Sequence, residues 1–290
     1  MTEREAAPAA VAGQSSRNLL MRIIAGAVLA PVAIAIAYAG GWLWTGLVTL
    51  AAIGLYVEWL TIVGAPRETR VVASGAVALA VAGCCLTLGR IDAALLVSVL
   101  GLTGVALLSS DRRGWTAGGF GYAAVAQIAS VVVRLDPEMG FVALVFVLLI
   151  VWVTDIGGYV AGRGIGGPKL WPRVSPKKTW AGALGGFLAS LIVAAGFAVF
   201  GSNKADPALT FKMGPVLLLA AVLSIASQLG DLFESAVKRR FGVKDSSHII
   251  PGHGGLMDRL DGFVAAVVLA AFFGFLRGGV DGVGRGLMVW

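Results

Sequence analysis

Nine apolar stretches, each roughly as long as one membrane crossing, constrain this chain more than any other feature of its sequence. A helix that spans a bilayer needs about 20 consecutive, mostly apolar residues. We therefore predict an all-α, polytopic integral membrane protein with about nine transmembrane helices. The expected spans are 19–38, 42–63, 71–89, 92–109, 115–133, 139–161, 180–200, 213–233 and 261–279.

Composition excludes an ordinary soluble protein. Of the 290 residues, 58% are hydrophobic and only 13% are charged, whereas an average soluble domain has about 25% charged residues. The net charge of +7 suits a cytoplasmic face beside anionic lipid, and it indicates no nucleic-acid partner.

The distribution of Lys and Arg predicts the orientation of the chain. When the nine spans are threaded in order, 17 of the 23 basic residues fall on the side of the N-terminus and six on the other. Loops rich in Lys and Arg usually stay in the cytoplasm. We therefore expect the N-terminus and the basic loops 162–179 and 236–260 to be cytoplasmic.

Three segments are expected along the chain. Residues 1–17 are polar and Ala-rich, which predicts a disordered cytoplasmic N-terminus. Residues 18–138 form N-terminal transmembrane helices with few polar side chains, and 139–290 form C-terminal transmembrane helices with cytoplasmic catalytic loops. The chemistry of the chain is therefore expected after residue 150.

Four carboxylates lie at the predicted cytoplasmic membrane border, where ionisable groups are functional candidates. Asp155 is near the inner end of the sixth span, and Asp231 is at the inner end of the eighth. Asp258 and Asp261, three residues apart, share one face of a helix at the start of the ninth.

Carboxylates that converge from different helices repel one another unless a cation lies between them. Oxygen ligands without a His/Cys cluster point to Mg²⁺ or Mn²⁺ rather than zinc, and the number of cations stays open. The adjacent Cys84 and Cys85 have no metal-binding spacing. A carboxylate-held metal among basic residues is typical of phosphoryl or nucleotidyl transfer.

Both cytoplasmic loops are suited to anionic ligands. The stretch after Asp231 combines five Lys or Arg residues with His253 and the glycines 254 and 255, whose backbone can approach a phosphate closely. The earlier loop carries Lys169, Arg173, Lys177 and Lys178, and its prolines restrict the backbone.

Three acidic residues have open interpretations. Glu58, alone in the second span, is a site residue, or it snorkels to the interface or bonds a neighbouring helix. Asp155 is a ligand or pairs with a cation such as Arg163. Glu234 is a ligand, a helix-orienting partner or the ion-pair partner of Lys238.

The segment from Ser235 to Asp261 resembles the signature of the phosphatidate cytidylyltransferases, also called CDP-diacylglycerol synthases. It reads Ser-x-apolar-Lys-Arg, four residues, Lys-Asp-x-small, two residues, apolar-Pro-x-His-Gly-Gly-apolar-x-Asp-Arg-apolar-Asp. QLGDLFESAVKR, SPKKTW and DIGGYVAGRGIGGPKL are similar to further parts of the family pattern. The resemblance covers about residues 150–265, and GGWLW and VEWL fit a weaker N-terminal pattern.

The resemblance implies a nine-helix fold, magnesium dependence and a place in the bacterial plasma (inner) membrane. It implies transfer of CMP from CTP to phosphatidic acid, which gives CDP-diacylglycerol and pyrophosphate in phospholipid biosynthesis. Asp231, Asp258 and Asp261 are the implied metal carboxylates, with Lys238 and Arg259 beside them in catalysis. The residues expected to contact CTP or the lipid phosphate are Ser175, Lys177, Lys178, Ser235, Arg239, Lys244, His253, Gly254 and Gly255.

One position departs from the family pattern. The sequence SPKKTW is usually followed by Glu-Gly, whereas this chain has Ala181 before Gly182. The departure keeps open a lipid-binding or scaffold protein without catalysis.

Two other membrane functions also stay open. A CDP-alcohol phosphotransferase would need two Asp residues four apart after an Asp-Gly-x-x-Ala-Arg run, which the chain lacks. A transporter could use Asp155 and Asp231 as a cation site, but it would not explain the basic, Gly-rich loop. The oligomeric state, a homodimer included, is left open.

Overall fold

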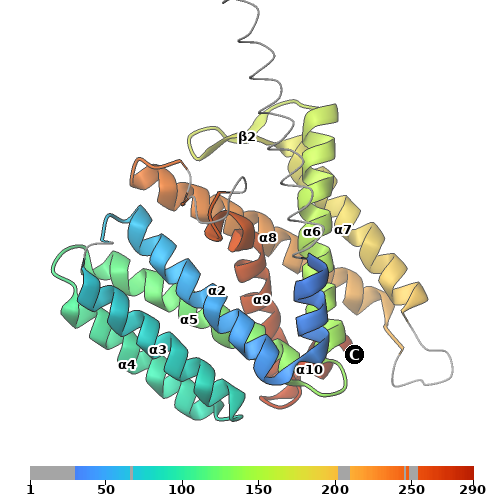
Figure 1. Cartoon of the computed structure of the whole chain (residues 1–290). Coiled ribbons are helices and arrows are strands. Elements are labelled where there is room, and N and C mark those ends of the chain that lie inside the picture. The colour runs from blue at the N-terminus through green and yellow to red at the C-terminus, as the bar shows by residue number, and fades with distance from the viewer. Residues whose placement is uncertain (1–29, 66–67, 202–209, 245, 248–253) are drawn as a thin grey trace, which may run out of the picture.

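The computed structural model describes residues 30–65, 68–201, 210–244, 246–247 and 254–290 as an assembly of long helices with one small hairpin (Figure 1). The elements are α2 (Gly41–Ile62), α3 (Thr69–Thr87), α4 (Ile91–Leu108), α5 (Arg113–Leu135), α6 (Gly140–Gly164), β1 (Lys169–Trp171), β2 (Ser175–Thr179), α7 (Trp180–Phe200), α8 (Met213–Arg240), α9 (Met257–Gly278) and α10 (Val283–Met288).

Eight helices in the described part of the chain are long and apolar enough to cross a membrane: α2 to α9. They correspond to eight of the nine predicted spans, and the all-α membrane fold is confirmed. Most of the first predicted span, 19–38, and the whole segment 1–17 lie outside the described residues; Ala30–Ala39 forms a shorter apolar helix. Helices are the expected form because a bilayer offers backbone groups no water.

The helices pack in pairs around two cores. The close pairs are α6 with α7, α8 with α9, α3 with α4 and α2 with α5. One core gathers residues of α6, α8 and α9, such as Phe146, Ile150 and Leu223, and the other surrounds Tyr56 and Phe120. The α3–α4 pair lies at the edge of the assembly (Figure 1), and few of its α4 side chains are buried.

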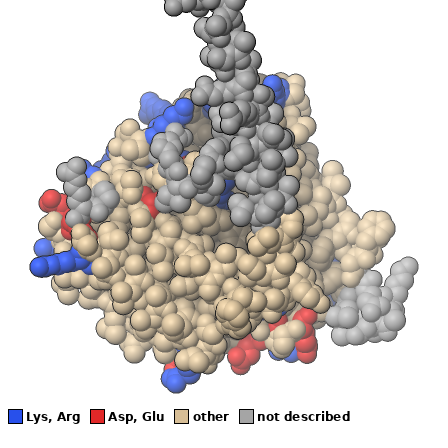
Figure 2. Space-filling view, viewed as in Figure 1, with Lys and Arg blue, Asp and Glu red and all other residues tan. Residues whose placement is uncertain are grey.

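An uncharged belt crosses the molecular surface. Figure 2 shows Lys, Arg, Asp and Glu mainly toward the two ends of this face, with a broad uncharged region between them. Such a belt suits contact with lipid tails, because charged side chains are costly in a bilayer core.

The largest departures from the predicted bounds concern polar segments. Helix α8 continues to Arg240, seven residues past its predicted end, and α9 begins at Met257, four residues before its predicted start. The two extensions contact each other through polar side chains, such as the ion pair between Lys238 of α8 and Asp258 of α9. The loop after α6 contains the antiparallel hairpin β1–β2, whereas its prolines predict only a loop with a restricted backbone.

The C-terminal helix α10 folds back against α9 and α6 at the end of the molecule opposite the hairpin (Figure 1). The buried Asp136, between α5 and α6, accepts hydrogen bonds from the backbone N–H groups of Arg285 (2.8 Å), Glu138 (3.0 Å) and Met139 (3.1 Å). Burial raises the pKa of Asp136, but these donors and the Arg285 guanidinium outweigh it and lower the pKa below its usual value.

Candidate active site

The site is built where α8 and α9 approach each other most closely. A Cβ added to Gly230 of α8 would lie 2.5 Å from the Asp261 carbonyl oxygen, and one on Gly262 of α9 would lie 2.5 Å from Ser227 Oγ. Glycine at both positions therefore lets the two backbones meet. The acidic neighbours of these glycines, Asp231 and Asp261, are brought together as a result.

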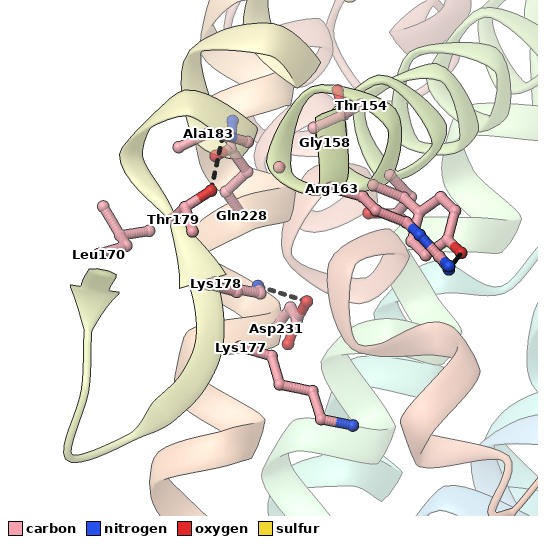
Figure 3. A pocket seen from close by; sticks show the side chains of 14 residues that line it. Thr154, Gly158, Arg163, Leu170, Lys177, Lys178, Thr179, Ala183, Gln228 and Asp231 are labelled. Atoms are coloured by element: carbon pink, nitrogen blue, oxygen red, sulfur yellow. Dashed lines mark hydrogen bonds and ion pairs between the residues drawn. The ribbon is translucent and has the colours of Figure 1, made fainter. Parts of the chain in front are cut away.

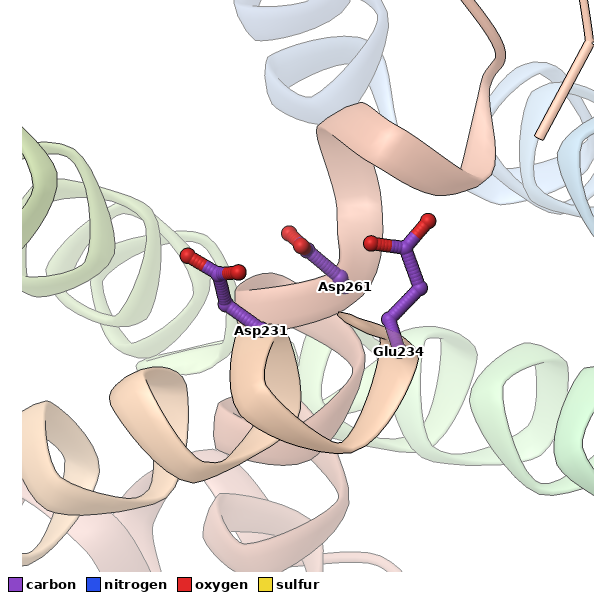
Figure 4. A group of neighbouring side chains, drawn as sticks. All are labelled: Asp231, Glu234 and Asp261. Carbon is purple, nitrogen blue, oxygen red and sulfur yellow. The ribbon is translucent and has the colours of Figure 1, made fainter. Parts of the chain in front are cut away.

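Three carboxylates converge at this contact. Ligand oxygens of Asp231, Glu234 and Asp261 all lie within 4.8 Å of one another, and Figure 4 shows the three groups gathered between α8 and α9. Glu234 is only 1% exposed, and its Oε1 has no hydrogen-bond partner among the described residues. A buried acceptor without a donor suits a cation as its partner.

Two lysines flank the carboxylate cluster. Lys178, from strand β2 of the hairpin, forms an ion pair with Asp231 (Figure 3). On the other side, Lys238 Nζ lies 2.9 Å from Glu234 Oε2. Each lysine offsets part of the repulsion among the carboxylates, and each is positioned to contact an anionic ligand.

Asp258 has a different environment from Asp261, although the two lie three residues apart at the start of α9. Its carboxylate forms an ion pair with Lys238 and accepts hydrogen bonds from Ser246 Oγ (2.8 Å) and from the backbone N–H groups of Ser246 (3.2 Å) and Gly255 (3.0 Å). Asp258 thus ties the loop before α9 to α8. Its role as a metal ligand stays a prediction.

A pocket of about 530 Å³ opens beside the cluster, between α6, α7, α8 and the hairpin. Its polar lining includes Lys177, Lys178, Gln228 and Asp231 (Figure 3). Asp155 also lines the pocket. The backbones of three glycines form part of its wall: Gly158, Gly162 and Gly182. This polar pocket therefore brings the cations of Lys177, Lys178 and Arg163 together with the carboxylates of Asp155 and Asp231.

A larger apolar groove, of about 960 Å³, lies on the other side of α8. It runs between α5, α8 and α9 and is lined by Trp59, Trp115, Tyr122, Phe233 and other apolar side chains. Phe233 remains 47% exposed and stacks on Trp59 at a centroid separation of 6.1 Å. Because Phe233 lies between Asp231 and Glu234 in the sequence, the groove passes close to the carboxylate cluster.

Comparison with known proteins agrees with this geometry. A family model described as "Cytidylyltransferase family" matches residues 20–276. The chain belongs to the cytidylyltransferase family. Among its relatives, a phosphatidate cytidylyltransferase of Brucella suis is 42% identical over 262 residues, which cover 89% of this chain and 93% of the relative.

Two shorter matches point the same way. A phosphatidate cytidylyltransferase of Haemophilus influenzae is 45% identical over 142 residues, 48% of each chain. One of Staphylococcus epidermidis is 47% identical over 126 residues, 43% of this chain and 46% of the relative. Membership of the cytidylyltransferase family favours a nucleotidyltransferase over the transporter and phosphotransferase alternatives.

Among the remaining predicted residues of this cytidylyltransferase, Ser235 contacts the cluster. Ser235 Oγ donates to Asp231 Oδ1 over 3.5 Å, and Arg239 reaches the Val243 carbonyl oxygen over 3.5 Å. Lys244 and Arg259 are exposed, and Ser175 begins β2. His253 lies outside the described residues.

The two glycines after His253 are explained by close contacts. Gly254 has a φ of +82°, which disfavours any other residue, and a Cβ there would lie 3.2 Å from Asp258 Oδ2. A Cβ on Gly255 would lie 1.8 Å from Ser246 Oγ and 2.7 Å from Glu58 Oε2. These glycines therefore let the loop close over Asp258; their contact with phosphate stays a prediction.

Sequence reasoning left some functional candidates undecided or unnamed. Glu234, left open there, belongs to the carboxylate cluster. Gln228 was not singled out, although its place one helical turn before Asp231 on a polar stripe of α8 could have indicated it. Asp155 and Arg163 both line the pocket. Arg163 donates to the Tyr159 hydroxyl over 2.7 Å and forms no ion pair with Asp155 among the described residues.

Proposed function

We propose that this chain is a phosphatidate cytidylyltransferase, which transfers CMP from CTP to phosphatidic acid and releases pyrophosphate. One observation carries the proposal: a carboxylate cluster lies between a cationic polar pocket and an apolar groove. A reaction between a water-soluble nucleotide and a lipid needs both environments beside one reactive centre. The relatives named above carry this activity in their names.

The polar pocket is the proposed binding site for CTP. Lys177 and Lys178 lie on its hairpin side, where their ammonium groups can neutralise phosphate oxygens. The glycines at this wall let α6 and α7 pack closely, since a Cβ on Gly182 would lie 2.8 Å from the Gly158 carbonyl oxygen. The pocket volume, about 530 Å³, is within the usual range for ligand sites.

The apolar groove is the proposed site for the acyl chains of phosphatidic acid. Its lining is dominated by aromatic and aliphatic side chains, and Phe233 and Leu229 of α8 are exposed beside it. Lipid tails can remain in the bilayer while the phosphate reaches the carboxylate cluster. Lys238, whose Nζ lies 2.9 Å from Glu234 Oε2, is the proposed contact for the lipid phosphate.

Asp231, Glu234 and Asp261 are the proposed ligands of a divalent cation, Mg²⁺ or Mn²⁺. Three clustered oxygen ligands, one of them a buried oxygen without a donor, fit such an ion. When bound, the ion would neutralise phosphate charge and polarise the reacting phosphorus. Asp258 is proposed to hold the loop and not the ion, and the experiment below tests this with Asp258→Asn.

In the proposed reaction, an anionic phosphate oxygen of phosphatidic acid attacks the α-phosphorus of CTP. A new P–O bond forms to the lipid, the bond from the α-phosphorus to the bridging oxygen breaks, and pyrophosphate leaves with that electron pair. The nucleophile is largely ionised near neutral pH because the second pKa of a phosphomonoester is about 6. No strong general base is therefore required. Lys178 and Lys238 hold the two anionic substrates in place.

The protein is a multi-pass membrane protein, and we place it in the bacterial inner membrane with the site facing the cytoplasm. The basic hairpin and the basic end of α8 lie on the same side as the site. That side is cytoplasmic by the charge rule, which suits a nucleotide substrate that is made in the cytoplasm.

The test uses purified protein in detergent with radiolabelled CTP, phosphatidic acid and Mg²⁺, and it measures CDP-diacylglycerol. We expect turnover by the wild type and a loss of about 100-fold or more in Asp261→Asn, about 2.7 kcal/mol in the barrier. Mn²⁺ binding, followed by electron paramagnetic resonance, should weaken in Asp261→Asn and persist in Asp258→Asn.

Asp92→Asn is the matched control, because Asp92 is exposed at the start of α4 and pairs only with the exposed Arg90 among the described residues. It should retain wild-type activity. No CDP-diacylglycerol from folded wild-type protein with either metal would refute the proposed function. Loss of Mn²⁺ binding in Asp258→Asn would instead add Asp258 to the metal ligands.

A further inference from the structure

Glu58 is a completely buried carboxylate in α2, far from the carboxylate cluster in sequence and on a different helix. A buried charge needs compensation, because its transfer from water into an apolar interior is costly. Its compensation comes from hydrogen bonds, since no salt bridge to Glu58 occurs within the described ranges.

Four donors surround the carboxylate, and all belong to the segment that leads into α9. Glu58 Oε1 accepts from Ser247 Oγ (2.5 Å) and from the Leu256 backbone N–H (2.8 Å). Its Oε2 accepts from the Met257 backbone N–H (2.7 Å) and lies 3.2 Å from Ser246 Oγ, whose single proton is shared with Asp258 Oδ2 at 2.8 Å. Glu58 of the N-terminal half thus contacts the segment between α8 and α9 at two places, Ser246–Ser247 and Leu256–Met257.

Two of these donors are the free N–H groups at the start of α9. The first N–H groups of a helix have no partner within the helix, and the helix dipole favours an anion there. Leu256, at the N-cap position, provides no side-chain cap. Glu58 therefore acts as the cap of α9 from another helix.

The neighbouring packing fits the same arrangement. A Cβ on Gly255 would lie 2.7 Å from Glu58 Oε2, and a Cβ on Gly54, one helical turn before Glu58, would lie 2.8 Å from the Leu256 side chain. Both glycines make room for the contact between α2 and the loop. This contact consequently fixes the position of the start of α9, where Asp258 lies in the first turn and Asp261 follows three residues later.

We infer that Glu58 is a positioning residue for catalysis: by capping α9 and holding Ser246 and Ser247, it sets the placement of Asp258 and Asp261. It does not touch the substrates or the carboxylate cluster. The kinetic part of this inference rests on the proposed function, whereas its structural part concerns the loop alone.

The test compares Glu58→Gln with wild-type protein in the same detergent. We expect kcat to fall about 10- to 100-fold and the half-saturating Mg²⁺ concentration to rise, as when an outer partner of a metal site is lost. The KM for phosphatidic acid should stay within about twofold. Glu58→Asp, which keeps the charge, should recover part of the activity.

Hydrogen exchange provides a measurement that is independent of activity. The amides of Leu256 and Met257 should exchange faster in Glu58→Gln, because their acceptor has been weakened. Gln127→Met is the matched control: buried Gln127 also bonds α2, through Thr49 Oγ1 at 2.8 Å, but makes no described contact with the loop. Its exchange at 254–260 and its kcat should match the wild type.

Ser247→Ala provides a milder variant if Glu58→Gln does not fold, because it removes one of the four hydrogen bonds. It should lower kcat about 2- to 10-fold and speed exchange at 254–260. Wild-type kinetics and exchange in these variants would overturn the inference. An equal increase in amide exchange at 254–260 in Gln127→Met would also overturn it, because the effect would then follow from the loss of any buried polar group of this region. An inactive wild type with the expected exchange differences would refute only the proposed function.

Discussion

Lys178 occupies the place where the hairpin meets the carboxylate cluster. Its ion pair with Asp231 joins β2 to α8, and it lines the polar pocket. A lysine in this position can exchange its carboxylate partner for a phosphate oxygen when a nucleotide enters. The residue therefore connects substrate binding with the arrangement of the site.

We predict that Lys178→Met lowers kcat/KM for CTP about 100-fold, because a charge-assisted contact with phosphate is lost. Steady-state kinetics with varied CTP will measure the effect. Lys169→Met is the control, since Lys169 lies in β1 of the same hairpin and does not line the pocket. Equal losses in both variants would contradict a specific role for Lys178.

At single positions, the sequence predicted that carboxylates converge from different helices, and the oxygens of Asp231 and Asp261 lie within 4.8 Å of each other. Their binding of a metal stays a prediction. Sequence reasoning could not separate Asp258 from Asp261, because a spacing of three residues places both on one helical face. The loop before α9 decides their difference, since it wraps around Asp258 alone. The role of Glu58 was equally hidden, because its donors come from residues nearly 200 positions away.

The pairing of α6 with α7 is built from small residues. A Cβ added to Gly185 of α7 would lie 2.2 Å from the Ala161 Cβ of α6. One added to Gly186 would lie 2.4 Å from the Thr154 carbonyl oxygen. Small residues allow such close approach of membrane helices. Because the same two helices form the wall of the polar pocket, their spacing also sets its width.

We predict that Gly186→Ala destabilises the protein by about 1–3 kcal/mol, since its methyl group would collide with backbone of α6. Thermal unfolding in detergent will show a lower midpoint temperature. In Gly196→Ala, on the same helix, the new methyl group meets nothing within 4 Å, so stability should be unchanged or slightly higher. A Gly186→Ala variant as stable as Gly196→Ala would contradict this account of the helix contact.

Helix positions were predictable from hydropathy because lipid contact requires long apolar runs. The ends of α8 and α9 were not, since their last and first turns carry charged side chains, such as Lys238 and Asp258, that hydropathy excludes from a span. The hairpin was missed for a similar reason: its five-residue second strand, rich in charge and containing Pro176, has no alternation of buried and exposed apolar residues.

Across the whole molecule, Asp136 joins the α5–α6 turn to the C-terminal helix. Its two oxygens accept hydrogen bonds from both segments, and Arg285 Nε lies 3.3 Å away. Its pKa is lowered in the folded protein, after the raising effect of burial, by these backbone donors and by Arg285. Ionised Asp136 therefore stabilises the folded state.

A lowered folded-state pKa contributes stability above the unfolded pKa, about 3.9, and that contribution is lost as pH falls through the folded value. We predict that Asp136→Asn lowers the unfolding free energy at pH 7 by about 1–3 kcal/mol, and that its difference from the wild type narrows below about pH 4. Melting curves at several pH values will test this. Asp281→Asn, at an exposed site before α10, is the control and should be as stable as the wild type at each pH. A loss of unfolding free energy in Asp136→Asn that stays the same at every pH would contradict this role of the ionised carboxylate.

The contact of Glu58 with the start of α9 also has a consequence for biogenesis. Translation adds about 5–20 residues per second, so the Met257 amide is made on the order of 10–40 s after its acceptor, 199 residues earlier in the chain. During that interval α2 carries an acidic group whose four donors have not yet been synthesised. Membrane insertion of the early helices must therefore tolerate an unmatched acid, and the site is completed only when the last long span arrives.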